Sequence, residues 1–279
     1  MKINAYAKIN LTLDIIGLLE NGFHELRSLM VPVSLCDEIE LIRSDKFDFY
    51  CNMPELATDD NLCVRAARYF FEESGIKDSV EIKLQKNIPF PAGLGGGSSD
   101  AAAVLRGLNI LFNSPLDEKT LYSLAEKLGS DVPFCLLSKP ALCEGRGEKL
   151  TPICDLPNLF VVIAIGSGRL STPKVFGEYD KAALPTENNT ERFLNALSAG
   201  NVDLAIAETG NAFEPITDIF APETMLLRNS LLSNGAIASH LSGSGPSVYG
   251  VFENEEKAEN AAKALQNMGY FAVSCKTVI

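Results

Sequence analysis

Apolar and polar positions along the chain predict a mixture of strands and helices. Segment 80–85 (Val-Glu-Ile-Lys-Leu-Gln) alternates strictly, which is typical of a strand with one buried face. Apolar runs at 11–17 and 159–165 predict two further strands. The apolar residues from 101 to 112 instead recur at helical spacing, so we expect a helix from about Asp100.

The pattern continues to the C-terminus in the same mixed fashion. Helices are expected at 116–128, 191–197, 202–208, 223–232 and 255–268. Two strand pieces within 239–252, a helix and a closing strand at 270–278 form a β-α-β run. The proline-rich stretch 152–157 indicates a boundary near Thr151, and the chain is therefore expected to hold two α+β domains, 1–151 and 152–279.

Composition adds a constraint on partners. Of 279 residues, 46% are hydrophobic and 22% charged, which is ordinary for a globular protein. The 36 acidic residues outnumber the 24 basic ones, giving a net charge of −12. Such a chain repels phosphate backbones and anionic membranes, so neither nucleic acid nor a membrane is an expected partner. An anionic ligand would have to be bound locally by backbone amides, a helix terminus or a cation.

The cysteines and the N-terminus favour a cytoplasmic protein. The seven cysteines are odd in number and contain no C-x-x-C pair, which argues against a disulfide framework or a zinc site. The first residues lack the apolar segment of a signal peptide. The apolar run 159–165 is too short to cross a bilayer.

A glycine-rich loop, Gly93-Leu94-Gly95-Gly96-Gly97-Ser98-Ser99, precedes the helix expected at Asp100. Its backbone N–H groups and the helix N-terminus can together bind an anion, and we expect Ser98 and Ser99 as N-caps. Their hydroxyls could also contact a phosphate or a phosphate-bound Mg²⁺. A flexible turn is the alternative interpretation, but glycines at this density destabilise a fold that gains no ligand from them.

Two well-known nucleotide motifs do not fit this loop. No lysine follows the glycines, as the Walker A sequence requires. Ser98 stands where the dinucleotide fingerprint has its third glycine, which disfavours a nicotinamide-dependent dehydrogenase.

Two charged residues allow two interpretations each. Asp131 precedes Val132-Pro133, and an aspartate before proline is a common helix N-cap. Lys8 lies in an apolar, strand-like segment, where a lysine ordinarily faces solvent. The residues alone favour these structural interpretations.

Three separated segments resemble the three motifs of the GHMP kinases: 5–11, 89–99 and 241–247. Three more resemble those members whose substrate carries a cytidine diphosphate group: 22–26, 128–133 and 145–148. The segments occur in order from residue 5 to residue 247, and the resemblance extends over nearly the whole chain. The resemblance implies an N-terminal nucleotide-binding domain of the ribosomal-protein-S5-domain-2-like type at 1–151, a C-terminal ferredoxin-like domain at 152–279, and an active site between the two.

The activity implied by the resemblance is ATP-dependent phosphorylation of an alcohol in the non-mevalonate route to isoprenoid precursors. ATP and Mg²⁺ are the implied cofactors, and the substrate is a small molecule with a cytidine diphosphate group. A kinase of the homoserine or mevalonate type and a non-catalytic nucleotide-binding relative are the alternatives. The protein is expected to be a monomer or a homodimer.

The resemblance also implies the roles of individual residues. Asp131 would be the catalytic base and Lys8 would orient it and stabilise charge on the transferred group. The implied substrate-binding residues are Asn10, Phe23, His24, Thr172 and Phe176. The implied nucleotide-binding residues are Asn61, Lys86, Pro89, Gly93, Leu94, Gly95, Gly96, Gly97, Ser98 and Ser99.

For the nucleobase, Phe23 and Phe176 would stack on the two faces of cytosine, with His24 at its edge. A structural histidine and two core phenylalanines are the alternatives. The loop 242–245 would pack on the glycine-rich loop and complete the phosphate-binding cleft, or it is a simple turn. The chain departs from the family pattern at Pro91 (usually Gly), Phe23 (usually Tyr) and Ala212 (often Asp).

Overall fold

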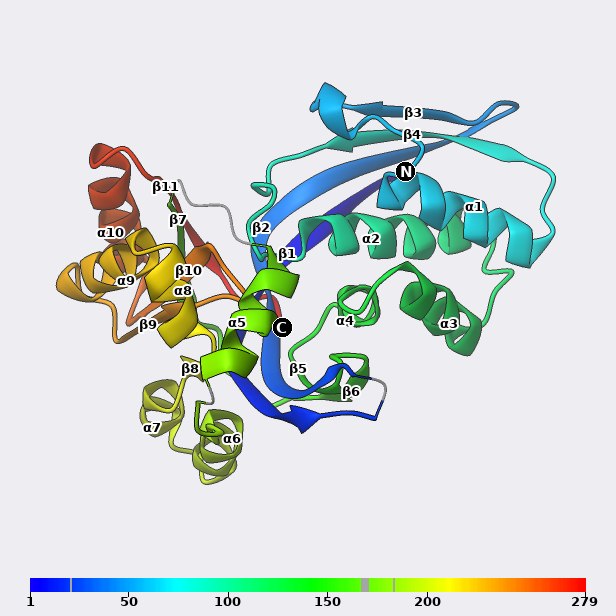
Figure 1. Cartoon of the computed structure of the whole chain (residues 1–279). Coiled ribbons are helices and arrows are strands. Elements are labelled where there is room, and N and C mark those ends of the chain that lie inside the picture. Colours follow the sequence, from blue (N-terminus) through cyan, green and yellow to red (C-terminus); the bar gives the residue numbers. More distant parts are fainter. Residues whose placement is uncertain (21, 167–170, 183) are drawn as a thin grey trace. The chain divides into compact units, whose positions relative to one another are not determined.

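The computed structural model describes residues 1–20, 22–166, 171–182 and 184–279 (Figure 1). The chain falls into two compact units. The first unit contains Met1–Lys8, Leu35–Pro89 and Gly95–Ser138, and the second contains Ile9–Ser34, Phe90–Leu94 and Lys139–Ile279. Each unit is described separately below.

The first unit is built on a sheet with the strand order β3-β4-β2-β1. Its strands are β1 (Lys2–Leu18), β2 (His24–Ser44), β3 (Asp48–Cys51) and β4 (Ser79–Gln85), with β1 and β2 extending into the second unit. Strand β4 is antiparallel to β2 and parallel to β3. Val80, Ile82 and Leu84 are buried, which confirms the predicted strand with one buried face.

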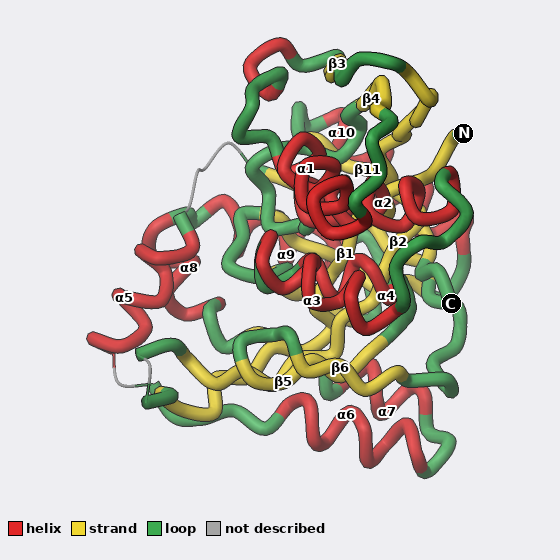
Figure 2. The backbone as a smooth tube through the Cα atoms, turned by 90° about the vertical axis from the view of Figure 1, so that its right-hand side faces the viewer, coloured by secondary structure: helices red, strands yellow, loops and turns green. Residues whose placement is uncertain are grey.

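Helices cover one face of this sheet (Figures 1 and 2). They are α1 (Leu62–Ser74), α2 (Gly96–Leu111), α3 (Glu118–Leu128) and α4 (Val132–Leu137), and a 3₁₀ turn (Pro54–Leu56) precedes α1. Ten of the 16 residues of α2 are buried, because it packs on the sheet and against the three other helices.

Gly107 allows α2 to approach the sheet closely. A Cβ atom there would lie 2.3 Å from Cδ1 of Ile3 and 2.5 Å from Cδ1 of Leu41. We expect Gly107→Ala to lower the free energy of unfolding by about 1–3 kcal/mol in urea denaturation, because overpacking outweighs the better helix propensity of alanine. In the control Gly97→Ala, the methyl group would contact only Leu62, at 3.6 Å. Equal midpoints for Gly107→Ala and wild type would contradict this packing.

The second unit contains an antiparallel sheet with the strand order β11-β7-β10-β9. Its strands are β7 (Phe160–Ile165), β9 (Ala238–Leu241), β10 (Ser247–Phe252) and β11 (Phe271–Lys276). The helices between β7 and β9 are α5 (Thr172–Ala182), α6 (Asn189–Ser198), α7 (Val202–Ala207), α8 (Glu214–Phe220) and α9 (Glu223–Ser233). With α10 (Glu255–Asn267) between β10 and β11, strand order and connections give the β-α-β-β-α-β arrangement of ferredoxin-like folds.

Three short strands complete the second unit. They are β5 (Ala141–Gly145), which pairs with β2, β6 (Lys149–Pro152), which pairs with β5, and β8 (Gly210–Asn211), which pairs with β1. The core of this unit joins apolar residues of β1, β7, α8, α9 and α10. The α+β class predicted from the sequence is confirmed, whereas the boundary between residues 151 and 152 stays a prediction.

One detail at the glycine-rich loop differs from the prediction. Ser98 and Ser99 are not N-caps, because α2 begins at Gly96 and Gly95 occupies the N-cap position with a left-handed φ of 68°. The N–H of Ser99 donates to the carbonyl of Gly95 at 2.8 Å, so both serines lie inside the first turn. Gly96 and Gly97 adopt helical geometry, which moves the start of the helix toward the N-terminus.

Within the described ranges, no helix combines the length and the apolar character that crossing a bilayer requires.

Candidate functional site

The side chain of Lys8 lies against the glycine-rich loop in the first unit. A Cβ atom on Gly95 would lie 2.8 Å from Cγ and 3.2 Å from Cε of Lys8. Glycine is therefore required at position 95 both for its left-handed backbone and for the space that the lysine occupies. The Lys8 side chain is only 5% exposed, so the strand-like segment holds it inward rather than toward solvent.

Lys8 and Asp131, which are 123 positions apart in sequence, form an ion pair. The distance between Nζ of Lys8 and Oδ2 of Asp131 is 3.7 Å, and 38% of the Asp131 side chain is exposed. Asp131 occupies the N-cap position of α4, but its side chain makes no capping hydrogen bond. The solvent-facing interpretation of Lys8 is therefore wrong. Asp131 does take the N-cap position, as predicted, but its carboxylate makes no capping bond and is accessible to a ligand.

The first turn of α2 offers unpaired donors beside this ion pair. The first N–H groups of a helix have no acceptor within the helix, and at this helix they belong to glycines and Ser98, which are all partly exposed. Ser99 is buried, and its hydroxyl donates to the carbonyl of Tyr6 in β1 at 2.7 Å. This bond fixes the turn to the strand that carries Lys8.

The remaining nucleotide-binding candidates of the first unit have structural partners. Asn61 caps α1, since its Oδ1 accepts from the N–H of Cys63 at 2.9 Å. Lys86 is buried, and its ammonium group donates to the carboxylates of Asp37 and Asp100. Pro89 is half-buried. Contacts of these residues with a nucleotide stay predictions.

In the second unit, Gly93 packs on the loop of the third motif. A Cβ atom on Gly93, whose φ is 77°, would lie 2.8 Å from the carbonyl oxygen of Ser242 and 3.0 Å from that of Gly245. The adjoining Leu94 is buried, and the N–H of Ser247 donates to the carbonyl of Ala92 at 3.3 Å. The predicted packing of the two loops is confirmed at this point.

Two residues of α8 and β8 hold the third motif in place. The side-chain amide of Asn211 donates to the carbonyls of Leu241 and Gly243, both at 2.9 Å. Glu214 accepts from the N–H of Leu241 at 2.9 Å and lies 3.1 Å from Nδ1 of His240. Neither role was predicted from the sequence, although Asn211-Ala212-Phe213-Glu214, with a polar residue at each end of an apolar pair, is a signal for both.

Two of the substrate-binding candidates stack on each other. The rings of His24 and Phe176 lie 4.6 Å apart with an interplanar angle of 30°, and Nε2 of His24 is 2.6 Å from Oδ1 of Asp180. Phe23 is 54% exposed, and the guanidinium carbon of Arg146 lies 5.2 Å from its ring centre. The structure therefore brings His24 and Phe176 together and places an arginine at Phe23.

The two other substrate-binding candidates make hydrogen bonds within the second unit. The hydroxyls of Thr172 and Ser244 are 2.7 Å apart, which links α5 to the third motif. Asn10 is buried, and its amide donates to the hydroxyl of Ser28 at 2.8 Å.

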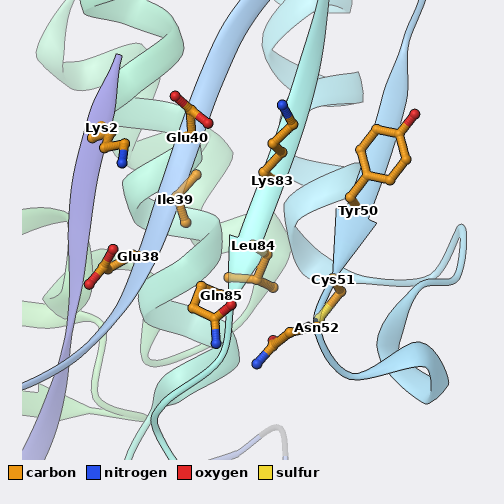
Figure 3. Close-up of a pocket in the computed structure, with 10 residues that line it drawn as sticks. All are labelled: Lys2, Glu38, Ile39, Glu40, Tyr50, Cys51, Asn52, Lys83, Leu84 and Gln85. Carbon is orange, nitrogen blue, oxygen red and sulfur yellow. Dashed lines mark hydrogen bonds between the residues drawn. The ribbon is translucent and has the colours of Figure 1, made fainter.

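The predicted site residues do not line the surface hollow that the first unit shows. Among the described residues, no group of three or more histidine, cysteine, aspartate or glutamate side chains is placed to hold a metal ion. A hollow of about 350 Å³ lies over strands β1 to β4 of the first unit (Figure 3). Glu40, Lys83 and Tyr50 line it, and none of the predicted site residues does.

Comparison with family models and curated proteins gives a consistent result. The model of the GHMP kinases N terminal domain matches residues 61–139, and that of the GHMP kinases C terminal domain matches 183–270. The 4-diphosphocytidyl-2-C-methyl-D-erythritol kinase of Caldicellulosiruptor bescii is 38% identical over 95% of this chain and 94% of its own length. The enzyme of the same name from Clostridium tetani is 36% identical over 96% of both.

Solved structures agree with the sequence relatives. The crystal structure of a 4-(cytidine 5'-diphospho)-2C-methyl-D-erythritol kinase superimposes with a TM-score of 0.87 at 34% identity, covering 99% of both chains. Homoserine kinase from Cytophaga hutchinsonii has a TM-score of 0.77 at 19% identity and covers 94% of that chain, a likeness that shows the fold alone.

Proposed function

The chain belongs to the GHMP kinases, and from this premise we propose that it phosphorylates the 2-hydroxyl of 4-diphosphocytidyl-2-C-methyl-D-erythritol with ATP. The observation that carries the proposal is the ion pair of Lys8 and Asp131 beside the first turn of α2. It places a carboxylate and a cation next to backbone donors suited to phosphates. The reaction belongs to the non-mevalonate route to isoprenoid precursors.

In the proposed mechanism, Asp131 accepts the proton of the substrate hydroxyl. The hydroxyl oxygen forms a bond to the γ-phosphorus of ATP as the bond from that phosphorus to the β–γ bridging oxygen breaks, which releases ADP. Lys8 orients Asp131, and its ammonium group stabilises negative charge on the transferred phosphoryl group. The partial exposure of Asp131 fits this division of work, because the base must reach the substrate hydroxyl.

The nucleotide and its metal ion would be held mainly by backbone. The phosphates would be bound by backbone N–H groups of the glycine-rich loop, which contains Gly93, Leu94, Gly95, Gly96, Gly97, Ser98 and Ser99. Asn61, Lys86 and Pro89 would lie near the adenine. Mg²⁺ supplies charge neutralisation at the phosphates. The ion would be held by the phosphates and by the hydroxyl of Ser98 in the first turn of α2. A hydroxyl oxygen is a ligand that Mg²⁺ accepts.

The cytidyl group is assigned to the second unit. Phe176 and His24 form an aromatic stack, and Phe23 offers an exposed ring. Stacking recognises a nucleobase without requiring a positive surface, which suits a chain of net charge −12. Thr172 and Asn10 are assigned to polar contacts with the substrate. We propose residues 1–151 as the nucleotide-binding domain and residues 152–279 as the C-terminal domain.

The proposal is tested by comparing alcohol substrates in a coupled ADP-release assay. We expect kcat/KM for the cytidyl substrate to exceed that for 2-C-methyl-D-erythritol 4-phosphate, homoserine or mevalonate by at least about 10³-fold, because a site with hydrogen-bonding groups rejects substrates that leave them unpaired. Equal activity with homoserine or mevalonate would indicate a kinase for another alcohol. Nucleotide binding without ADP formation from any of the four would indicate a non-catalytic relative.

A further inference from the structure

Buried polar side chains connect strands β1 and β2 in the second unit. Asn10 and Thr12 in β1, Ser28 in β2 and Thr190 in α6 all belong to this group, with at most 4% of each residue exposed. Of the four, only Asn10 is assigned to the substrate. Its Nδ2 donates to the hydroxyl oxygen of Ser28 at 2.8 Å, so Ser28 lies directly behind a residue of the proposed site.

The hydroxyl of Ser28 has a fixed polarity. It carries one proton and donates it to the carbonyl oxygen of Thr12 at 2.6 Å, because a carbonyl oxygen can only accept. Toward Asn10, the hydroxyl oxygen therefore acts as an acceptor, and only the amide nitrogen can pair with it. An amide rotated by half a turn would place Oδ1 against Oγ of Ser28, two buried acceptors with no proton between them.

The carbonyl group that receives the Ser28 proton is itself held in place. Oγ1 of Thr12 accepts from the N–H of Leu29 at 3.0 Å and lies 2.7 Å from Oγ1 of Thr190. The N–H of Thr190 in turn donates to the buried carboxylate of Asp14 at 2.8 Å. Because β1 and β2 are neighbours in the sheet, these bonds fix the two strands against each other where Ser28 meets Thr12.

The orientation of Asn10 decides which kind of group its amide oxygen can bind. With Nδ2 turned toward Ser28, Oδ1 is directed away from it, and an amide oxygen accepts hydrogen bonds but donates none. A hydroxyl group of an alcohol can donate such a bond, whereas an ionised phosphate oxygen cannot. The amide oxygen of Asn10 therefore suits the alcohol end of the substrate rather than its diphosphate.

We propose that Ser28 is a positioning residue for the phosphoryl transfer, because it fixes the amide of Asn10 with the oxygen toward a hydroxyl of the alcohol substrate. This inference rests on the proposed function in so far as Asn10 contacts the alcohol. Ser28 acts through Asn10 and does not itself touch the substrate. A serine with a purely structural role would stabilise the fold, and its loss would not depend on Asn10.

The test is a double-variant cycle of Ser28 and Asn10 in the coupled ADP-release assay. Ser28→Ala removes the acceptor, so the amide of Asn10 can rotate and present its nitrogen to the hydroxyl. We expect kcat/KM for the cytidyl substrate to fall about 10–100-fold, the effect of a buried hydrogen-bonding group that loses its partner, with the KM for ATP unchanged. Asn10→Ala should lower kcat/KM at least as far, and adding Ser28→Ala to it should cause no further loss.

Thr190→Val is the matched control for a general loosening of this region. It removes a buried hydroxyl of the same hydrogen-bond network, one that bonds Thr12 and the carbonyl of Arg27 rather than Asn10. Urea denaturation should show that Thr190→Val and Ser28→Ala lose similar stability, while kcat/KM falls only in Ser28→Ala. A second variant, Ser28→Thr, keeps the hydroxyl and is expected to retain the wild-type kcat/KM.

Several results would overturn the role of Ser28. They are a wild-type kcat/KM in Ser28→Ala, an equal loss in Thr190→Val or Ser28→Thr, and losses that multiply when Ser28→Ala is combined with Asn10→Ala. The proposed function fails separately, if the wild type phosphorylates homoserine or mevalonate in place of the cytidyl substrate. The cycle is then measured with that alcohol, and a loss in Ser28→Ala that disappears in the Asn10→Ala background still supports the role of Ser28.

Discussion

Replacing Asp131 by asparagine is expected to lower kcat by about 10²–10⁴-fold, the range of a lost general base, with little change in ADP affinity. The asparagine keeps the size of the side chain and its place at the start of α4, but it cannot accept the hydroxyl proton. Folding should be preserved, because the Asp131 side chain makes no capping bond and is 38% exposed. Turnover is measured by coupled ADP release, and affinity by calorimetry.

Two further variants make this result specific. Asp45→Asn removes an exposed carboxylate of the same unit away from the site, and turnover should stay at the wild-type level. Lys8→Ala should lower turnover in the same direction as Asp131→Asn, because the carboxylate loses its partner at 3.7 Å. Near-normal turnover in both Asp131→Asn and Lys8→Ala would refute the assignment of the ion pair to catalysis.

Replacing Gly95 by alanine is expected to lower kcat/KM for ATP by about 10²-fold, the cost of a displacement of about 1 Å in a catalytic site. The new methyl group would lie 2.8 Å from Cγ of Lys8, so either the lysine or the first turn of α2 must move. The left-handed backbone at φ 68° adds about 1–2 kcal/mol of strain.

Gly75→Ala is the matched control for this prediction. Gly75 has a similar φ of 67° at the end of α1, but a Cβ atom there meets nothing within 4 Å. Both variants should therefore lose similar stability from backbone strain, while only Gly95→Ala loses activity. If the two variants keep the same kcat/KM, the contact between Lys8 and the glycine-rich loop does not matter for catalysis.

The sequence predicted the elements that depend on local patterns. The alternation at 80–85 and the helical spacing after residue 100 correspond to β4 and α2. Local cap preference failed at Ser98 because Gly96 and Gly97 already belong to the helix and Gly95 takes the N-cap position, which no single-residue preference describes. Apolar and polar patterns carry short-range information. They predicted which elements form better than they predicted where each helix begins.

The site depended on long-range pairing, which periodicity cannot give. From the residues alone, Lys8 is a solvent-facing lysine and Asp131 a helix cap. Only the family resemblance predicts that the two side chains pair, which the distance of 3.7 Å confirms. The ion pair of Lys86 with Asp37 could not be predicted from periodicity, because the two residues lie 49 positions apart. Net charge indicated that anions would have to be bound locally, but it could not indicate by which residues.

The central claim is that this chain transfers the γ-phosphoryl group of ATP to a cytidyl-bearing alcohol. The most direct measurement is ³¹P NMR of a reaction containing ATP, Mg²⁺, the enzyme and 4-diphosphocytidyl-2-C-methyl-D-erythritol. We predict one ADP for each new phosphomonoester, located on the 2-hydroxyl, and no ADP when the alcohol is omitted. ADP formation without a phosphomonoester, or an unchanged substrate in the presence of bound ATP, would contradict the claim.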